Sequence, residues 1–166
     1  MKKIQEAIIN VEKIFENKSG PEPDIGAKAV VENGLMCRIQ SPDGKFIKTD
    51  MSEILGGTAT ANSPGWLSRA AIASCDATLL AMRAAREGIV LDKIEVKVDA
   101  CSDGRGMFLD IGVSPASSEI RVLFNVRATN VSRVKIKELV DWVVAHSPVG
   151  NDSTRAIKMI IDIEPE

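Results

Sequence analysis

The first part of the chain carries two different hydrophobic patterns, one helical and one extended. Apolar residues recur every three or four positions at Ile4, Ile8, Val11 and Phe15. This spacing predicts an N-terminal amphipathic helix within residues 1–20, which the SGPEP segment ends. Further on, LMCRIQ and KFIKT flank SPDGK. Pro-Asp-Gly between two apolar runs predicts a turn that joins two strands, as in a hairpin or short meander within residues 25–49.

A long helix is predicted over residues 63–88. Ser63 is a suitable N-cap, Pro64 suits the first helical position, and Gly88 provides the stop signal. A helix of this length is roughly 35 Å long, and its many alanines allow other elements to approach closely. Its charged residues are too frequent for a membrane span. We therefore interpret residues 63–88 as a buried central helix that follows the Gly56-Gly57 turn.

After Gly88 the apolar residues alternate with polar ones, which predicts half-buried strands near residues 94–98 and 120–127. The run MFLDIGV is a candidate for a third strand between them. Helical spacing returns over residues 132–146, and RAIKMIIDIE at 155–164 is predicted to be a last strand. The order indicates an α+β fold of antiparallel sheet with packed helices, in a single domain that spans residues 1–166.

Composition narrows the classes of partner and compartment. The formal net charge is -2 and no block of Lys and Arg occurs, so nucleic acid is not an expected partner. Polar residues interrupt the apolar positions of the N-terminus, which excludes a signal peptide, and we expect a cytoplasmic protein without membrane association. The three cysteines are scattered without CxxC spacing. Neither a metal site nor a cofactor is expected, and free thiols fit a reducing compartment.

Cys75 is the residue that raises a chemical question, because it lies in the middle of the long helix. It is about eleven residues from the helix start, too far for the helix dipole to activate it. A lone cysteine in an Ala-rich helix is usually a small core residue, whereas a reactive thiol needs a nearby cation such as Arg38, Arg69 or Arg83. Asp76 is interpreted as a structural partner of Arg69, Arg83 or a backbone donor. Both interpretations of the cysteine stay open at this point.

The central third of the sequence resembles the OsmC/Ohr-like family, the osmotically inducible and organic hydroperoxide resistance proteins. The resemblance is carried by ILGGTATANSPGWLSRAAIASCDATLLAMRAAREGI, with Gly-Gly, a small linker, a Pro-initiated helix, a cysteine and a Gly-Ile stop. KIEVKVDACSDGRG and HSPVGN follow in a similar order and spacing. The resemblance extends over roughly residues 25–163, as an ordered set of motifs.

The resemblance implies an OsmC-like fold, in which antiparallel sheets wrap around long central helices in an intertwined homodimer with active sites at the subunit interface. It also implies that Cys75 attacks organic hydroperoxides. The family's second cysteine, in a Cys-Pro motif, is replaced by Ser147, which is not expected to be active. Gly65 stands where the peroxidases tend to carry a glutamate that holds the activating arginine. Arg38 is the nearest candidate for that arginine.

Two functions follow as expectations. The first is a single-cysteine thiol peroxidase of oxidative stress, which reduces small apolar hydroperoxides through a sulfenic acid on Cys75 and is restored by an external thiol. The second is a dimeric protein of the same fold that has lost the chemistry. Such a protein would bind a small molecule in an apolar interface pocket or serve a structural role.

Overall fold

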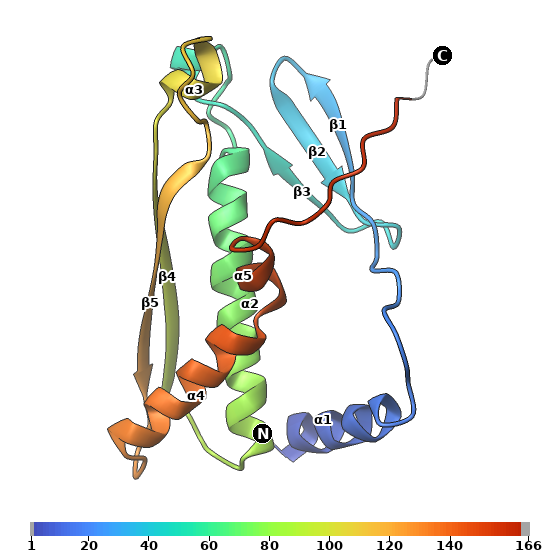
Figure 1. The fold of residues 1–166 in the computed structure, drawn as a ribbon, viewed down its shortest axis with the longest axis vertical. Coiled ribbons are helices and arrows are strands. Elements are labelled where there is room, and N and C mark those ends of the chain that lie inside the picture. The colour runs from blue at the N-terminus through green and yellow to red at the C-terminus, as the bar shows by residue number, and fades with distance from the viewer. Residues whose placement is uncertain (1, 164–166) are drawn as a thin grey trace. The chain divides into compact units, whose positions relative to one another are not determined.

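A computed structural model describes residues 2–163 as a mixture of helices and antiparallel strands (Figure 1). The elements in chain order are α1 (Lys2–Phe15), β1 (Lys28–Asn33), β2 (Met36–Gln40), β3 (Phe46–Thr49), the 3-10 helix η1 (Glu53–Leu55), α2 (Pro64–Arg86), β4 (Lys93–Ser102), α3 (Arg105–Phe108), β5 (Ser117–Arg127), α4 (Arg133–His146) and α5 (Pro148–Asp152). Within this part of the chain, no helix is both long and apolar enough to cross a membrane.

The chain forms two compact units, each assembled from separate stretches of sequence. The core unit consists of Met1–Glu6, Ile72–Lys97 and Val122–Glu166, and the sheet unit consists of Ala7–Ala71 and Val98–Arg121. The helix α2 and the strands β4 and β5 therefore contribute residues to both units. The candidate cysteine belongs to the core unit.

The core unit is organised around one face of α2. Ile72, Leu80 and Ala84 are buried at intervals of four or eight residues, as expected for a single helical stripe. The central cluster consists of Leu80, Ala84, Leu139 and Val143. Because Ala84 has a short side chain, α4 can pack close to α2 there. One face of α2 is therefore buried in the core unit, whereas its opposite face, with Met82, is exposed in the single chain.

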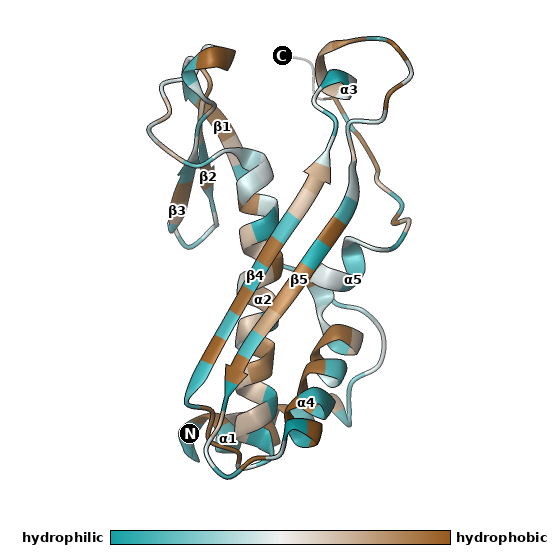
Figure 2. Ribbon diagram, turned by 90° about the vertical axis from the view of Figure 1, so that its left-hand side faces the viewer, coloured by the Kyte–Doolittle hydropathy of each residue, from teal (hydrophilic) through white to brown (hydrophobic). Residues whose placement is uncertain are grey.

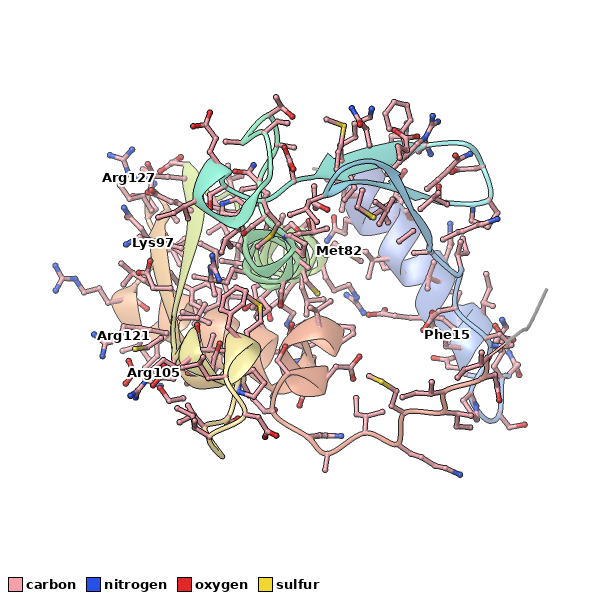
Figure 3. All side chains as sticks on the ribbon, turned by 90° about the horizontal axis from the view of Figure 1, so that it is seen from above. Phe15, Met82, Lys97, Arg105, Arg121 and Arg127 are labelled. Carbon is pink, nitrogen blue, oxygen red and sulfur yellow. The ribbon has the colours of Figure 1, made fainter. Side chains whose placement is uncertain are left out.

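The predicted alternation of β4 and β5 is confirmed. In the core unit, Asp92 N donates to Arg127 O over 2.8 Å, and Asn125 Nδ2 donates to Glu95 Oε2 over 3.0 Å. Figure 2 shows apolar and polar positions alternating along both strands. In Figure 3, Lys97 and Arg127 project from the side of the strands away from α2. The apolar positions of this pair are half-buried against the core cluster.

The sheet unit contains the predicted meander, with three antiparallel strands in the order β1-β2-β3. Val30 pairs with Arg38, and Arg38 in turn pairs with Lys48. The SPDGK segment forms the turn between β2 and β3, closed by a hydrogen bond from Gly44 N to Ser41 O at 3.0 Å. The predicted turn between these two strands is therefore confirmed.

A tight polar loop connects this sheet to α2. Asp50 is only 2% exposed, and its carboxylate accepts hydrogen bonds from Met51 N, from the backbone and hydroxyl of Thr58, and from the backbone and hydroxyl of Thr60. The hydrogen bond from the Thr58 hydroxyl, at 2.6 Å, is the largest of the effects that lower the pKa of Asp50 from 3.8 to about 2. The Asp50 carboxylate thus holds the backbone at Met51, where the loop begins, and at Thr58 and Thr60 further along it.

Replacing Asp50 should reveal a stabilisation that depends on pH. The folded-state pKa is below the ordinary value of 3.8, so this stabilisation is present above 3.8 and is lost as pH falls toward 2. We expect Asp50→Asn to lower the midpoint of urea unfolding at neutral pH, and the difference from the wild type to shrink below about pH 4. Asp24→Asn, at an exposed position of the same unit, is the control. A difference that stays constant through the acid range would contradict this role.

Two strand predictions were wrong. Residues 107–113 were expected to form a strand, but the structure has the short helix α3 followed by a bend, with Gly106 packed against the backbone of Val113. The predicted last strand at 155–164 is also absent from its described part, since residues 155–163 lie in no strand. Residue 164 lies outside the described residues. A strand needs hydrogen-bonding neighbours as well as an apolar sequence, and neither segment has them in this single chain.

Candidate functional site

The position of Cys75 follows from the local signals that bound α2. Trp66 N donates to the Ser63 hydroxyl over 3.2 Å, which caps the first turn. At the other end, Gly88 adopts a φ of 71°, a left-handed conformation that ends the helix. Both predicted boundary signals are confirmed. Cys75 consequently lies in the middle of a regular helix, where it is half-buried.

Ser147 occupies the short connection between α4 and α5. Its backbone N–H bonds to Val143 O at 2.8 Å, so it ends α4, and its hydroxyl accepts a hydrogen bond from Gly150 N at 3.1 Å, so it caps α5. Asn151 Nδ2 donates to Ser147 O over 2.7 Å and fixes the connection from its other side. The residue is 1% exposed. The Ser-Pro sequence is thus an N-cap followed by proline at the first helical position.

The structure brings Cys75 and Ser147 together. The Ser147 hydroxyl donates to Cys75 Sγ over 3.6 Å, an ordinary length for a hydrogen bond to sulfur, across 72 positions of sequence. Because Gly150 N–H already occupies a lone pair of Ser147 Oγ, the hydroxyl proton is left to point at the sulfur. The result is a short hydrogen-bond chain from a backbone amide through a hydroxyl to the thiol.

This arrangement gives the Cys75 sulfur a hydrogen-bond donor. A buried hydroxyl that donates to a thiol donates more strongly to a thiolate, since bonds to ionised acceptors are the stronger ones. The same hydroxyl cannot form a disulfide with an oxidised Cys75. The geometry therefore gives the Cys75 sulfur a hydroxyl donor at position 147, in place of a resolving thiol.

Arg38 and the two remaining cysteines, Cys37 and Cys101, lie in the sheet unit. The Arg38 guanidinium stacks over the Phe46 ring at 4.1 Å and has Glu32 at 3.9 Å, while its Nε is buried without a hydrogen-bond partner. It lines a hollow of about 710 Å³ formed by β1, β2 and the segments that flank them. Its pairing with Cys75 stays a prediction. Cys37 on β2 and Cys101 on β4 are free thiols.

Asp76 does not have the partners that the sequence suggested. It is 4% exposed, and its Oδ1 atom is buried without any hydrogen-bond partner. Arg83 instead forms an ion pair with Glu87, from Nε to Oε1 at 2.7 Å, and stacks on Trp142 at 4.6 Å. The hydrogen bond from Lys135 and the charge of Arg83 lower the pKa of Glu87. The interpretation of Asp76 as a partner of Arg83 was therefore wrong. Glu87 is one helical turn from Arg83 and forms the ion pair with it.

His146 lies in the last turn of α4 and contacts a backbone carbonyl of the same helix. Its Nδ1 atom lies 2.7 Å from Trp142 O, and the two rings stack with their centres 4.1 Å apart. Asn151 and Gly150, by contrast, were not identified from the sequence as parts of the site, although the Ser-Pro cap signal points to the turn that contains them. Among residues 2–163 the structure has no cluster of three or more His, Cys, Asp or Glu side chains that could hold a metal ion.

Known proteins share this arrangement of elements. An OsmC-like protein of Mycoplasma pneumoniae superposes with a TM-score of 0.68 at 18% identity, covering 81% of this chain and 89% of the other. An organic hydroperoxide resistance protein of Legionella pneumophila gives 0.58 at 18% identity, covering 80% and 90%. The corresponding values for the organic hydroperoxide resistance protein OhrB of Bacillus subtilis are 0.50, 24%, 77% and 90%. No curated protein sequence matches this chain.

Membership follows from sequence as well as from fold. The family profile described as OsmC-like protein matches residues 57–162, which include Gly57 of the Gly-Gly turn, all of α2 with Cys75, and the Ser147 connection. This match covers well over half of the chain, and the α+β fold with antiparallel sheets is the one found in the solved OsmC and Ohr structures. The chain belongs to the OsmC-like protein family.

Proposed function

We propose that this protein is a single-cysteine, thiol-dependent peroxidase that reduces organic hydroperoxides at Cys75. The observation that carries the proposal is the hydrogen bond from the buried Ser147 hydroxyl to the half-buried Cys75 sulfur. Solved structures of similar fold are named organic hydroperoxide resistance proteins, which supports the substrate class. Free thiols suit a reducing compartment, and we place the protein in the cytoplasm.

The proposed reaction balances without a bound cofactor. The Cys75 thiolate attacks the outer oxygen of the hydroperoxide, the O–O bond breaks, and with one proton the products are an alcohol and a sulfenic acid on Cys75. An external thiol then displaces water to form a mixed disulfide, and a second thiol releases Cys75 and leaves as the external disulfide. Ser147 donates a hydrogen bond to the sulfur at the start and end of this cycle.

Mass spectrometry after brief exposure to cumene hydroperoxide tests the proposal. We expect the peptide containing Cys75 to gain one oxygen atom, and a second with excess oxidant, while an added small thiol prevents the gain. Consumption of the hydroperoxide should need both that thiol and Cys75, so Cys75→Ser is the matched inactive variant. If Cys37 or Cys101 is oxidised while Cys75 stays unmodified, the peroxidase proposal is contradicted. The protein would then be the binding or structural member of the family.

We further propose that the active form is a homodimer. The single chain leaves many large apolar side chains in water, among them Val31 on β1 at 64% exposure and Ile161 in the C-terminal segment at 79%. We propose that a second copy of the chain covers part of this exposed apolar surface. Sedimentation equilibrium at micromolar concentration should give twice the chain mass of 17.9 kDa. A mass of one chain would contradict the homodimer, and with it the active site that the resemblance implies at the subunit interface.

Arg38, rather than Arg69, is the arginine that we propose to serve the thiolate. Arg69 is six residues before Cys75 on α2, about 240° around the helix, so its side chain leaves from another face. We expect Arg38→Ala to slow the alkylation of Cys75 by iodoacetamide at neutral pH by about tenfold, because the proposed role of Arg38 is to favour the thiolate. Arg69→Ala should alkylate at nearly the normal rate. The opposite ranking, in two folded variants, would reverse the assignment.

A further inference from the structure

The hollow on the β1–β2 part of the sheet is a feature that the proposed chemistry does not use. Its volume of about 710 Å³ is within the range that is usual for small-molecule sites. The residues of its lining that matter here are Lys28, Val30, Glu32, Arg38, Gln40 and Pro42. All of them belong to the sheet unit, so the hollow is complete within one unit of the chain.

The strand register explains why polar side chains gather in this hollow. In the antiparallel β1–β2 pair, Val30 lies opposite Arg38 and Lys28 lies opposite Gln40. Side chains alternate along a strand, so residues two positions apart share a face, and these four side chains leave the same face of the sheet. Val31, whose exposure supports the homodimer, leaves β1 on the opposite face.

Arg38 is held in the hollow but keeps a donor without a partner. Its guanidinium stacks over Phe46, with 4.1 Å between Cζ and the centre of the ring. The Arg38 Nη1 atom lies 3.9 Å from Glu32 Oε1, which is an ion pair but is longer than a hydrogen bond. Its Nε atom is buried, and no residue in the described part of the chain accepts a hydrogen bond from it. A buried donor of this kind favours an acceptor that enters from the hollow.

The charges on this face favour an anion. Glu32 also bonds to Lys48, with 3.2 Å between Oε2 and Nζ, so two cations share its carboxylate. Lys28 adds a third cation at the hollow. Asp43, in the adjoining turn, is paired with Lys45 at 2.7 Å. Three cations and one carboxylate therefore surround the hollow, and this excess of positive charge attracts a negatively charged ligand.

We infer that the hollow binds a small carboxylate that carries an apolar chain. The Arg38 guanidinium presents a planar fork of donors that matches the two oxygens of a carboxylate. Lys28 and the Gln40 amide supply further donors, while Val30 and Pro42 line the hollow with apolar groups for the chain. The inference goes beyond the proposed function and does not rest on it, because every residue that it uses belongs to the sheet unit.

Isothermal titration calorimetry with hexanoate tests this site in the full-length chain. We expect saturable binding at millimolar concentrations of hexanoate. Hexanol has the same chain without the charge, and inorganic phosphate has the charge without the chain. Each should bind about tenfold more weakly than hexanoate, because charge-assisted bonds to the guanidinium and apolar contacts both contribute.

Three variants connect this binding to the hollow. Arg38→Lys keeps the positive charge but loses the planar fork, so it should weaken hexanoate binding by about tenfold. Lys28→Ala removes a charge that does not form the fork and should weaken binding by about threefold. Lys13→Ala removes the same charge from the exposed end of α1, in the same unit but outside the hollow, and should bind hexanoate like the wild type.

Each contrary result would overturn the inference. These results are no hexanoate binding, equal affinity for hexanol or phosphate, unchanged affinity in a folded Arg38→Lys variant, and equal losses in Lys28→Ala and Lys13→Ala. If Arg38→Lys does not fold, the comparison of Lys28→Ala with Lys13→Ala decides the question. Binding is measured without a hydroperoxide or an added thiol, so the result is independent of whether Cys75 proves to be a peroxidase thiol.

Discussion

Ser147→Cys should change the oxidation product of Cys75 from a sulfenic acid to a disulfide. The Ser147 Oγ and Cys75 Sγ atoms are 3.6 Å apart, and a thiol at position 147 would begin with its sulfur even closer, because the C–S bond is longer than C–O. A disulfide needs a separation of about 2.05 Å, which a small rotation of the two side chains can provide. Attack of the new thiol on the sulfenic acid releases water and forms the S–S bond.

Intact-mass measurement after exposure to cumene hydroperoxide distinguishes the two products. The wild type should gain oxygen on Cys75, whereas Ser147→Cys should lose two hydrogens and regain them with a reductant. Ser153→Cys adds a thiol at an exposed position just past α5 and should behave like the wild type. Persistent oxygen gain without a disulfide in a folded Ser147→Cys variant would show that the two positions do not approach one another in solution.

The second large effect is expected in the loop that leads to α2. A Cβ atom at Gly57 would lie 2.0 Å from Met51 O, far inside van der Waals contact, and that carbonyl is held in place by a hydrogen bond from Ala59 N at 3.1 Å. The nearest atoms belong to the backbone, so no side-chain rotation can relieve the clash. We expect Gly57→Ala to destabilise the protein by about 3 kcal/mol or more.

Urea unfolding of Gly57→Ala beside Gly26→Ala checks this expectation. Gly26 is in the same unit and has no atom within 4 Å of an added Cβ, so its substitution should change the unfolding free energy little. The effect of Gly57→Ala is structural rather than chemical. It should therefore also appear in a Cys75→Ser background, which lacks the candidate catalytic thiol. Equal stability of the two alanine variants would contradict the close packing at Gly57.

Local signals explain why the helices could be predicted closely. Ser63, Pro64 and Gly88 act within a turn of their own positions, and they set the start and end of α2 within two residues of the predicted bounds. The same is true of α4, which begins after the Ser132 cap. The N-terminal helix ends earlier than predicted, at Phe15 instead of residue 20. A cap or a left-handed glycine is a property of a few neighbouring residues, so the sequence is enough.

Strands and polar partners depended on distant residues, and there the sequence was less informative. The apolar run at 107–113 has the composition of a strand but becomes a helical turn and a bend, where Gly106 lies against Val113. Arg83 was one of the partners predicted for Asp76, yet it forms its ion pair with Glu87. Composition cannot choose between such partners, because the choice depends on which side chains the fold brings within reach.

The sequence by itself determined the α+β class, the bounds of α2, the family and the candidate cysteine, since each depends on local order or on an ordered set of motifs. Tertiary structure alone decided what surrounds that cysteine. It placed Ser147, 72 positions away, within hydrogen-bond distance of the sulfur, and it left Asp76 Oδ1 buried without a partner. The physical reason is that a thiol's reactivity depends on donors and charges within a few ångströms, and these arrive from elements far apart in the chain.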